Sequence, residues 1–202
     1  MTIKKLPKPY YQDDVATLYH GDSLDILPLL DPCDVVVTDP IWPDCEKIFP
    51  GVDAYQLFSA AAQHFPRLCK RLCVIMGCDS DPRMLRAVPP ALKFFRVSWM
   101  GIVPARYRGS LLAASEVLYT FGERYLNKDA GQVRCVPGET RHVFRSNGKF
   151  ISDHPCPRYM NHMEWIIGNY TRPGATIIDP FMGTGTIGRA VKNAGGAEVY
   201  RH

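Results

Sequence analysis

Apolar residues along this chain recur at two spacings, one typical of buried strands and the other of amphipathic helices. Residues 34–38 (DVVVT) contain a continuous run of valines, which predicts a strand buried on both faces of a parallel sheet. Further strands are predicted over 16–21, 72–77, 94–100, 116–121 and 175–178, with an edge strand at 198–201.

Segments with helical spacing separate these strands. Within 160–170, the residues Met163, Ile166, Ile167 and Tyr170 fall on one face of a helix. Further helices are predicted over 23–30, 55–71, 81–87 and 186–194, the first of them capped by Asp22 or Ser23. Strands that alternate with helices predict an α/β fold with a doubly wound, mostly parallel sheet. In such folds, ligands bind beyond the carboxyl ends of the strands.

The composition is that of an ordinary globular protein, and residues 1–202 are interpreted as a single domain. Hydrophobic residues make up 46% of the chain and charged residues 22%. The first residues, MTIKKLPKPYYQDD, lack the apolar core of a signal peptide, and no apolar run approaches the roughly 20 residues that span a bilayer. Seven cysteines without such a signal indicate a reducing compartment, so a cytoplasmic protein without a membrane partner is expected. No familiar zinc-ligand spacing is present, so no metal is expected.

The net charge of +4 is concentrated in one part of the chain. Residues 101–150 hold eight Lys or Arg and four Asp or Glu, so their excess equals that of the whole chain. Glycine and proline punctuate this region, which indicates a loop-rich basic insert. Such an insert is a candidate for contacting the phosphates of DNA, beginning with Arg106 and Arg108, although a plain solvated surface fits the same charge pattern.

The string DPFMGTGT at 179–186 joins a predicted strand directly to a predicted helix. Its glycines allow the backbone to approach a ligand, and the N-terminus of the following helix offers free N–H groups and a partial positive charge. Such an element binds a carboxylate or a phosphate, but no lysine follows, which disfavours a nucleoside triphosphate site. A tight strand–helix turn without a ligand is the alternative interpretation.

A second string, TDPIW at 38–42, follows the valine-rich strand. Asp39 is predicted to lie at the carboxyl end of that strand, where Pro40 and Pro43 enforce a loop. Taken alone, the string also fits a proline-rich loop in which Asp39 is a cap and Trp42 packs into the core.

Together, and in this order, the two strings resemble the amino-methylating DNA methyltransferases in which the catalytic motif precedes the cofactor motif. The likeness extends over roughly residues 16–196 and points to a small, phage-type member with a Rossmann-like fold. It implies that the chain uses S-adenosyl-L-methionine and acts on double-stranded DNA, with a homodimer as a further candidate assembly. It assigns the binding of the cofactor to Asp22, His154, Asp179, Pro180, Phe181, Gly183, Thr184, Gly185 and Thr186.

The resemblance assigns catalysis to Asp39, Pro40, Ile41 and Trp42. The exocyclic amine of a base is a poor nucleophile because its lone pair is delocalised into the ring. A carboxylate and a main-chain carbonyl, here those of Asp39 and Pro40, accept its hydrogens and localise that lone pair. Trp42 offers a face on which an extruded base can stack. Ile41 departs from the family pattern, which has a second proline there.

Two other parts of the chain depart from the family pattern. The segment HPCPRY at 154–159 resembles a His-Pro-x-x-Lys-Pro segment, with Arg158 and Tyr159 in place of lysine and proline. In the family, the strand after the cofactor helix also ends in an acidic residue that holds the cofactor ribose. Glu198 is the nearest candidate, in a shifted register; without it the cofactor would bind more weakly.

The sequence therefore predicts a site-specific DNA methyltransferase, with N6 of adenine favoured over N4 of cytosine because Asp opens the catalytic string. Two alternatives remain at this point. One is a methyltransferase-like module that binds nucleic acid with little or no turnover, which the isoleucine at position 41 favours. The other is an RNA base methyltransferase, since the same chemistry serves RNA.

Overall fold

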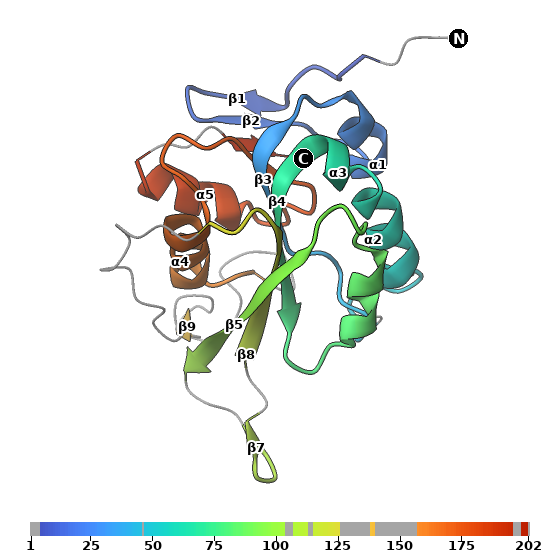
Figure 1. Cartoon of the computed structure of the whole chain (residues 1–202), viewed down its shortest axis with the longest axis vertical. Coiled ribbons are helices and arrows are strands. Elements are labelled where there is room, and N and C mark those ends of the chain that lie inside the picture. Colours follow the sequence, from blue (N-terminus) through green and yellow to red (C-terminus); the bar gives the residue numbers. More distant parts are fainter. Residues whose placement is uncertain are drawn as a thin grey trace.

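The computed structural model describes residues 5–45, 47–103, 107–112, 115–125, 138–139, 157–195 and 199–201. Across these residues runs a sheet with the strand order β1-β2-β11-β10-β3-β4-β8-β5-β9 (Figure 1). Its strands are β1 (Tyr11–Gln12), β2 (Ala16–Leu18), β3 (Cys33–Thr38), β4 (Cys69–Gly77), β5 (Phe94–Val103), β8 (Ser115–Gly122), β9 (Gly138–Glu139), β10 (Ile177–Asp179) and β11 (Val199–Arg201).

The central strands are parallel, as the sequence predicts. Strands β2, β11, β10, β3 and β4 all run in one direction, and β8 and β5 follow as antiparallel neighbours. The predicted edge position of the last strand is wrong, because β11 pairs with β10 on one side and with β2 on the other. A short strand with neighbours on both sides cannot be told from an edge strand by its own residues.

Helices cover both faces of the sheet (Figure 1). On one face lie α4 (Met160–Tyr170) and α5 (Thr186–Asn193), and on the other lie α1 (Ser23–Ile26), α2 (Ala54–Ala62), α3 (Phe65–Leu68) and the 3₁₀ turns η1 (Leu27–Leu29) and η2 (Pro82–Ala87). Side chains alternate across β3, so Val36 belongs to the core under α2 while Val35 and Val37 belong to the core under α4 and α5. The doubly wound α/β prediction is confirmed.

Prolines shorten two of the predicted helices. The helix expected over 55–71 ends at Ala62, and a separate turn of helix, α3, begins at Phe65 with Pro66 in its first positions. Proline has no N–H to donate and its ring clashes with the preceding turn, so a helix breaks there. The helix expected over 23–30 likewise passes into a 3₁₀ turn that contains Pro28. By contrast, α4 spans 160–170 as predicted, and its four apolar residues are all buried.

The basic insert 101–150 is described only in part. Strands β6 (Tyr107–Arg108) and β7 (Leu111–Leu112) form a separate hairpin that stands away from the main sheet (Figure 1). Of the eight basic residues in this insert, only Arg124 has a side chain within the described residues. The role of the insert in contacting DNA therefore stays a prediction.

Among the helices that the structure describes, none combines the length and the apolar character needed to cross a membrane.

Candidate active site

The two strings singled out in the sequence follow neighbouring strands. Strands β3 and β10 pair in parallel, with Ile177 opposite Val35 and Ile178 opposite Val36. Asp39 directly follows β3 and Asp179 is the last residue of β10, so both lie at the carboxyl edge of the sheet. The order of the strands, and not proximity in the sequence, brings the two loops together.

Both loops line one pocket of about 230 Å³. The residues that line it are Asp39, Pro40, Ile41, Trp42, Cys45, Phe49, Arg158, Phe181, Met182, Gly183, Thr184, Thr186 and Ile187. All four residues of the predicted catalytic string are among them, with four residues of the predicted cofactor set. The structure thus joins the two strings over a single hollow.

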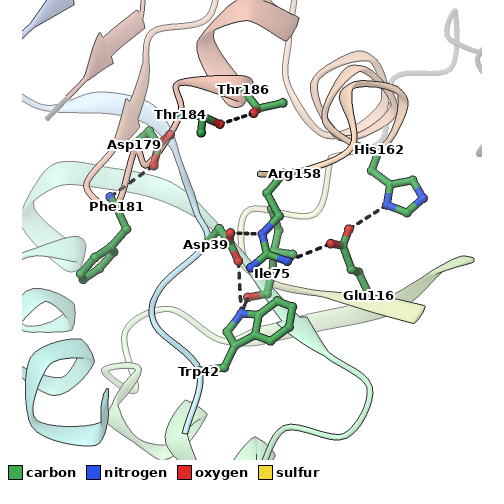
Figure 2. A network of polar contacts seen from close by, with 10 residues as sticks. All are labelled: Asp39, Trp42, Ile75, Glu116, Arg158, His162, Asp179, Phe181, Thr184 and Thr186. Carbon is green, nitrogen blue, oxygen red and sulfur yellow. Dashed lines mark hydrogen bonds and ion pairs between the residues drawn. The ribbon is translucent and has the colours of Figure 1, made fainter. Parts of the chain in front are cut away.

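The loop after β10 has the geometry of a helix-terminal binding turn. Gly183 and Gly185 have positive φ angles of 52° and 72°, a conformation that glycine adopts without the penalty that a side chain carries. Gly185 is the N-cap of α5, and the side-chain oxygens of Thr184 and Thr186 lie 2.9 Å apart beside it (Figure 2). This turn fits a carboxylate such as the one at the methionine end of S-adenosylmethionine.

Other members of the predicted cofactor set lie behind or outside the pocket. Asp179 is fully buried, and its Oδ1 accepts a hydrogen bond of 3.3 Å from the N–H of Phe181, which shapes the turn from below. Pro180 is also buried, and neither residue lines the pocket. Asp22 is exposed and its carboxylate caps α1 by accepting from the N–H of Leu24. His154 and Glu198 lie outside the described residues.

The indole of Trp42 is held in place beside Asp39. Its Nε1–H is shared between Oδ1 of Asp39, at 3.1 Å, and the carbonyl of Ile75 on β4, at 3.2 Å (Figure 2). Gly77, at the end of β4, leaves room for the ring, because a Cβ atom there would lie 2.7 Å from Cζ3 of Trp42. The ring thus contacts the backbone of β4, and its position depends on that glycine.

A guanidinium group lies against the predicted catalytic carboxylate. Arg158 donates its Nε–H to Oδ2 of Asp39 and an Nη1–H to Oε1 of Glu116, at 3.0 Å (Figure 2). Its guanidinium carbon lies 4.2 Å from the centre of the Trp42 ring, in cation–π contact. The side chains of Asp39 and Arg158 are only 13% and 18% exposed, so little water screens the ion pair.

The network continues from Glu116 into the core. Oε2 of Glu116 lies 2.7 Å from Nδ1 of His162, whose Nε2 lies 2.8 Å from the carbonyl oxygen of Gly101. A carbonyl oxygen can only accept a hydrogen bond, so Nε2 carries a proton there. Glu116 and His162 are both buried, and together they fix the far side of the Arg158 guanidinium.

Arg158, Glu116 and His162 were not among the predicted catalytic or cofactor-binding residues. The available signals were a glutamate that opens the apolar strand EVLYTF and a histidine beside the apolar face of 160–170. Charged and imidazole groups at buried positions need partners, so each pointed to a buried contact without naming it.

Burial and charge shift the pKa values of this network in different directions. Burial raises the pKa of Asp39 to about 6, with Glu116 adding to the increase and Arg158 opposing it. Burial also raises the pKa of Glu116. The hydrogen bond with His162 and the charge of Arg158 outweigh that effect, so the pKa of Glu116 lies below its ordinary value. Burial lowers the pKa of Arg158, and the charges of Asp39 and Glu116 more than compensate, so its pKa is raised and it stays protonated.

Comparison with known families is consistent with this arrangement. A family model for N6 and N4 amino-methyltransferases, described as DNA methylase, matches residues 75–199, more than half of the chain. The chain belongs to this family. The match includes Arg158 and the loop after β10 but begins after Asp39, so the assignment of Asp39 rests on the geometry and on the sequence motif.

Solved structures of DNA methyltransferases share the fold. The PvuII DNA methyltransferase, described as cytosine-N4-specific, superposes with a TM-score of 0.68 at 16% identity over 96% of this chain and 83% of its own. The complex of M1.HpyAVI with S-adenosylmethionine gives 0.60 at 19% identity, over 93% and 92%. TTHA0409 from Thermus thermophilus, also with S-adenosylmethionine, gives 0.55 at 15% identity, over 90% and 85%. No curated protein sequence matches the chain.

S-Adenosylmethionine is the methyl donor of this family, in agreement with the cofactor expected from the sequence. The family level leaves the choice between adenine and cytosine open.

Proposed function

We propose that this protein transfers a methyl group from S-adenosylmethionine to the exocyclic amine of a base in double-stranded DNA. The observation that supports this proposal is the shared pocket, in which Asp39 and the Gly183–Thr186 turn face the same space. The cofactor supplies an electrophilic methyl group on a sulfonium. The chain supplies acceptors for the amine hydrogens and a turn for the carboxylate of the cofactor.

The amine requires two acceptors to become nucleophilic. The carboxylate of Asp39 is one, and the carbonyl of Pro40, which also lines the pocket, is the second. As both hydrogens are drawn into hydrogen bonds, the nitrogen lone pair is withdrawn from the ring and turns toward the methyl group. The ionised form of Asp39 is the effective acceptor, since a protonated carboxyl would itself donate.

Within this function, adenine N6 is proposed over cytosine N4, because an aspartate opens the catalytic string. The test is a nucleoside assay with the full chain, cofactor carrying a labelled methyl group and unmethylated DNA. Digestion and chromatography then separate N6-methyladenine from N4-methylcytosine, and an equal mass of RNA is run in parallel. Label in N6-methyladenine supports the proposal, whereas label confined to RNA contradicts it.

Two variants sharpen this assay. Asp39→Ala removes the acceptor and is expected to abolish transfer while S-adenosylmethionine still binds. Asp25→Ala is the matched control, because Asp25 is exposed in α1 and lies outside the pocket. Equal transfer by the wild type and Asp39→Ala would contradict the proposed chemistry.

A second candidate function has an observation in its favour. The guanidinium of Arg158 already occupies one oxygen of Asp39, and isoleucine replaces the second proline of the family string. Both features fit a module that binds DNA and cofactor with little turnover. Tight binding of DNA and cofactor without label transfer would support this module over the enzyme.

A further inference from the structure

Arg158 and Asp39 present a hydrogen-bond donor and an acceptor side by side in the pocket. Nε of Arg158 is bonded to Asp39 and Nη1 to Glu116, which leaves Nη2 without an acceptor among the described residues. Arg158 also lines the pocket. Nη2 is not among the buried side-chain atoms of the described residues that lack a partner, and the Arg158 side chain keeps 18% of its surface exposed. The Nη2 group is therefore the part of Arg158 that a ligand can meet.

This donor–acceptor pair matches one kind of base edge. In adenine and in cytosine, the exocyclic amine stands next to a ring nitrogen that accepts hydrogen bonds: N1 or N7 in adenine, and N3 in cytosine. Guanine at O6 and thymine at O4 present a carbonyl instead, which a carboxylate repels. The carboxylate thus accepts a hydrogen bond from the amine, while the guanidinium beside it donates one to the adjacent ring nitrogen.

We propose that Arg158 is a specificity residue that donates a hydrogen bond to the ring nitrogen beside the target amine held by Asp39. This inference rests on the proposed function, because it needs a base in the pocket. Glu116 and His162 are then positioning residues: they hold Nη1 so that Nη2 faces the base. Recognition of the base then depends on a ring nitrogen that the methyl group never touches.

The orientation of the guanidinium is set by the surrounding contacts. The group is held by a carboxylate at each side and by the Trp42 ring below it. Lysine, a point charge on a flexible stem, can satisfy only part of this arrangement at any one time. The lysine that is usual at this place in the family string therefore does not substitute for Arg158 in this pocket.

The test removes the ring nitrogen of the base and leaves the protein group in place. One DNA fragment is prepared in three forms, with adenine, 1-deazaadenine or 7-deazaadenine, and transfer is measured for the wild type, Arg158→Met and Arg158→Lys. We expect the wild type to lose roughly tenfold to a hundredfold in kcat/KM on one of the two analogues, the usual range for a hydrogen bond from a charged donor. Arg158→Met should lose activity on adenine DNA and show no further loss on that analogue.

The two substituted proteins and a control separate the possible explanations. Arg83→Met, which changes an exposed arginine in η2, should keep the full analogue penalty of the wild type. Arg158→Lys keeps a positive charge between the two carboxylates and should retain the fold if Arg158→Met loses it. The analogue penalty in the wild type is in any case independent of how the variants fold.

Each outcome decides the question. Equal losses in the wild type and in Arg158→Met on every analogue, or no loss in the wild type, would overturn the role of Arg158 and leave the methyltransferase proposal intact. If the label appears in N4-methylcytosine, the wild type and Arg158→Met are compared on DNA with cytosine or 3-deazacytosine instead. The wild type is again expected to lose activity on the analogue, and Arg158→Met to show no further loss. Absence of transfer to unmodified DNA by the wild type would defeat the proposed function, and this inference with it.

Discussion

Asp39 and Arg158 stand 119 positions apart in the sequence and form an ion pair in the wall of the candidate active site (Figure 2). The carboxylate is the group that the methyl-transfer chemistry needs as an acceptor, and the guanidinium holds one of its oxygens. Because Trp42 donates to the other oxygen, the carboxylate is fixed from two sides before any base enters. Polar groups that are already fixed lose little conformational entropy when a base binds, which favours catalysis by positioning.

The raised pKa of Asp39 predicts an acidic limb in the rate. Because burial raises the pKa of Asp39 to about 6, the ionised form declines as the pH falls through 6, and kcat/KM should decline with it. Glu116 contributes to the raised pKa, so Glu116→Gln should move the midpoint of this limb to lower pH. The measurement is kcat/KM from pH 5 to 8 for both proteins. A midpoint that moves to higher pH in Glu116→Gln would contradict the charge coupling.

Gly77→Ala should displace the Trp42 indole. The new Cβ would lie 2.7 Å from Cζ3 of the ring, closer than carbon atoms approach, so the ring must move and its hydrogen bond with Asp39 is strained or lost. Overpacking of this kind costs about 1–3 kcal/mol, and kcat/KM should fall by a comparable factor of roughly 5 to 150. The dissociation constant of S-adenosylmethionine should stay within about twofold, because the cofactor turn is unaffected. Parallel losses in cofactor binding and in rate would point to general unfolding.

Gly185→Ala should weaken cofactor binding more than it weakens the fold. Gly185 has a φ of 72° at the N-cap of α5, where a side chain costs about 1–2 kcal/mol, so the turn should relax and S-adenosylmethionine should bind roughly 5- to 30-fold more weakly. Gly195→Ala is the matched control, since Gly195 has a φ of 83° beyond the other end of the same helix, with open space around it. Calorimetry with cofactor and a thermal melt measure the two effects. Equal losses of affinity in both variants would contradict the assignment of the turn.

Ile41→Pro should restore the stiffness of the catalytic loop. Proline fixes φ near −65°, so fewer loop conformations compete with the productive one, and kcat should rise by roughly twofold to fivefold. The carbonyl of Pro40, the second acceptor for the amine, is the group whose placement improves. Single-turnover rates on one DNA fragment provide the measurement. An unchanged or lower rate would show that the loop is already ordered by Trp42 and Asp39.

Much of the fold follows from local sequence. Consecutive valines at 35–37 place apolar side chains on both faces of a strand, which indicates burial on both sides, so β3 was predictable. The loop that begins at Asp39 was predictable as well. The glycine spacing at 183 and 185 allows a turn that few other residues adopt, which marks the start of α5. Pro66 also indicated a break between α2 and α3, although the helical spacing of the apolar residues around it predicted one continuous helix.

The contacts that define the site were not predictable in this way. Three separate segments supply the network: β8 carries Glu116, the segment before α4 carries Arg158, and α4 carries His162. No local motif marks any of the three as a residue of the site. Their partners are set by which strands lie next to each other, just as the inner position of β11 is. Local spacing determines which side chains must be buried. The pairing of strands decides which buried charges meet, because a charge removed from water is held by whatever opposite charge or dipole the packing brings to it.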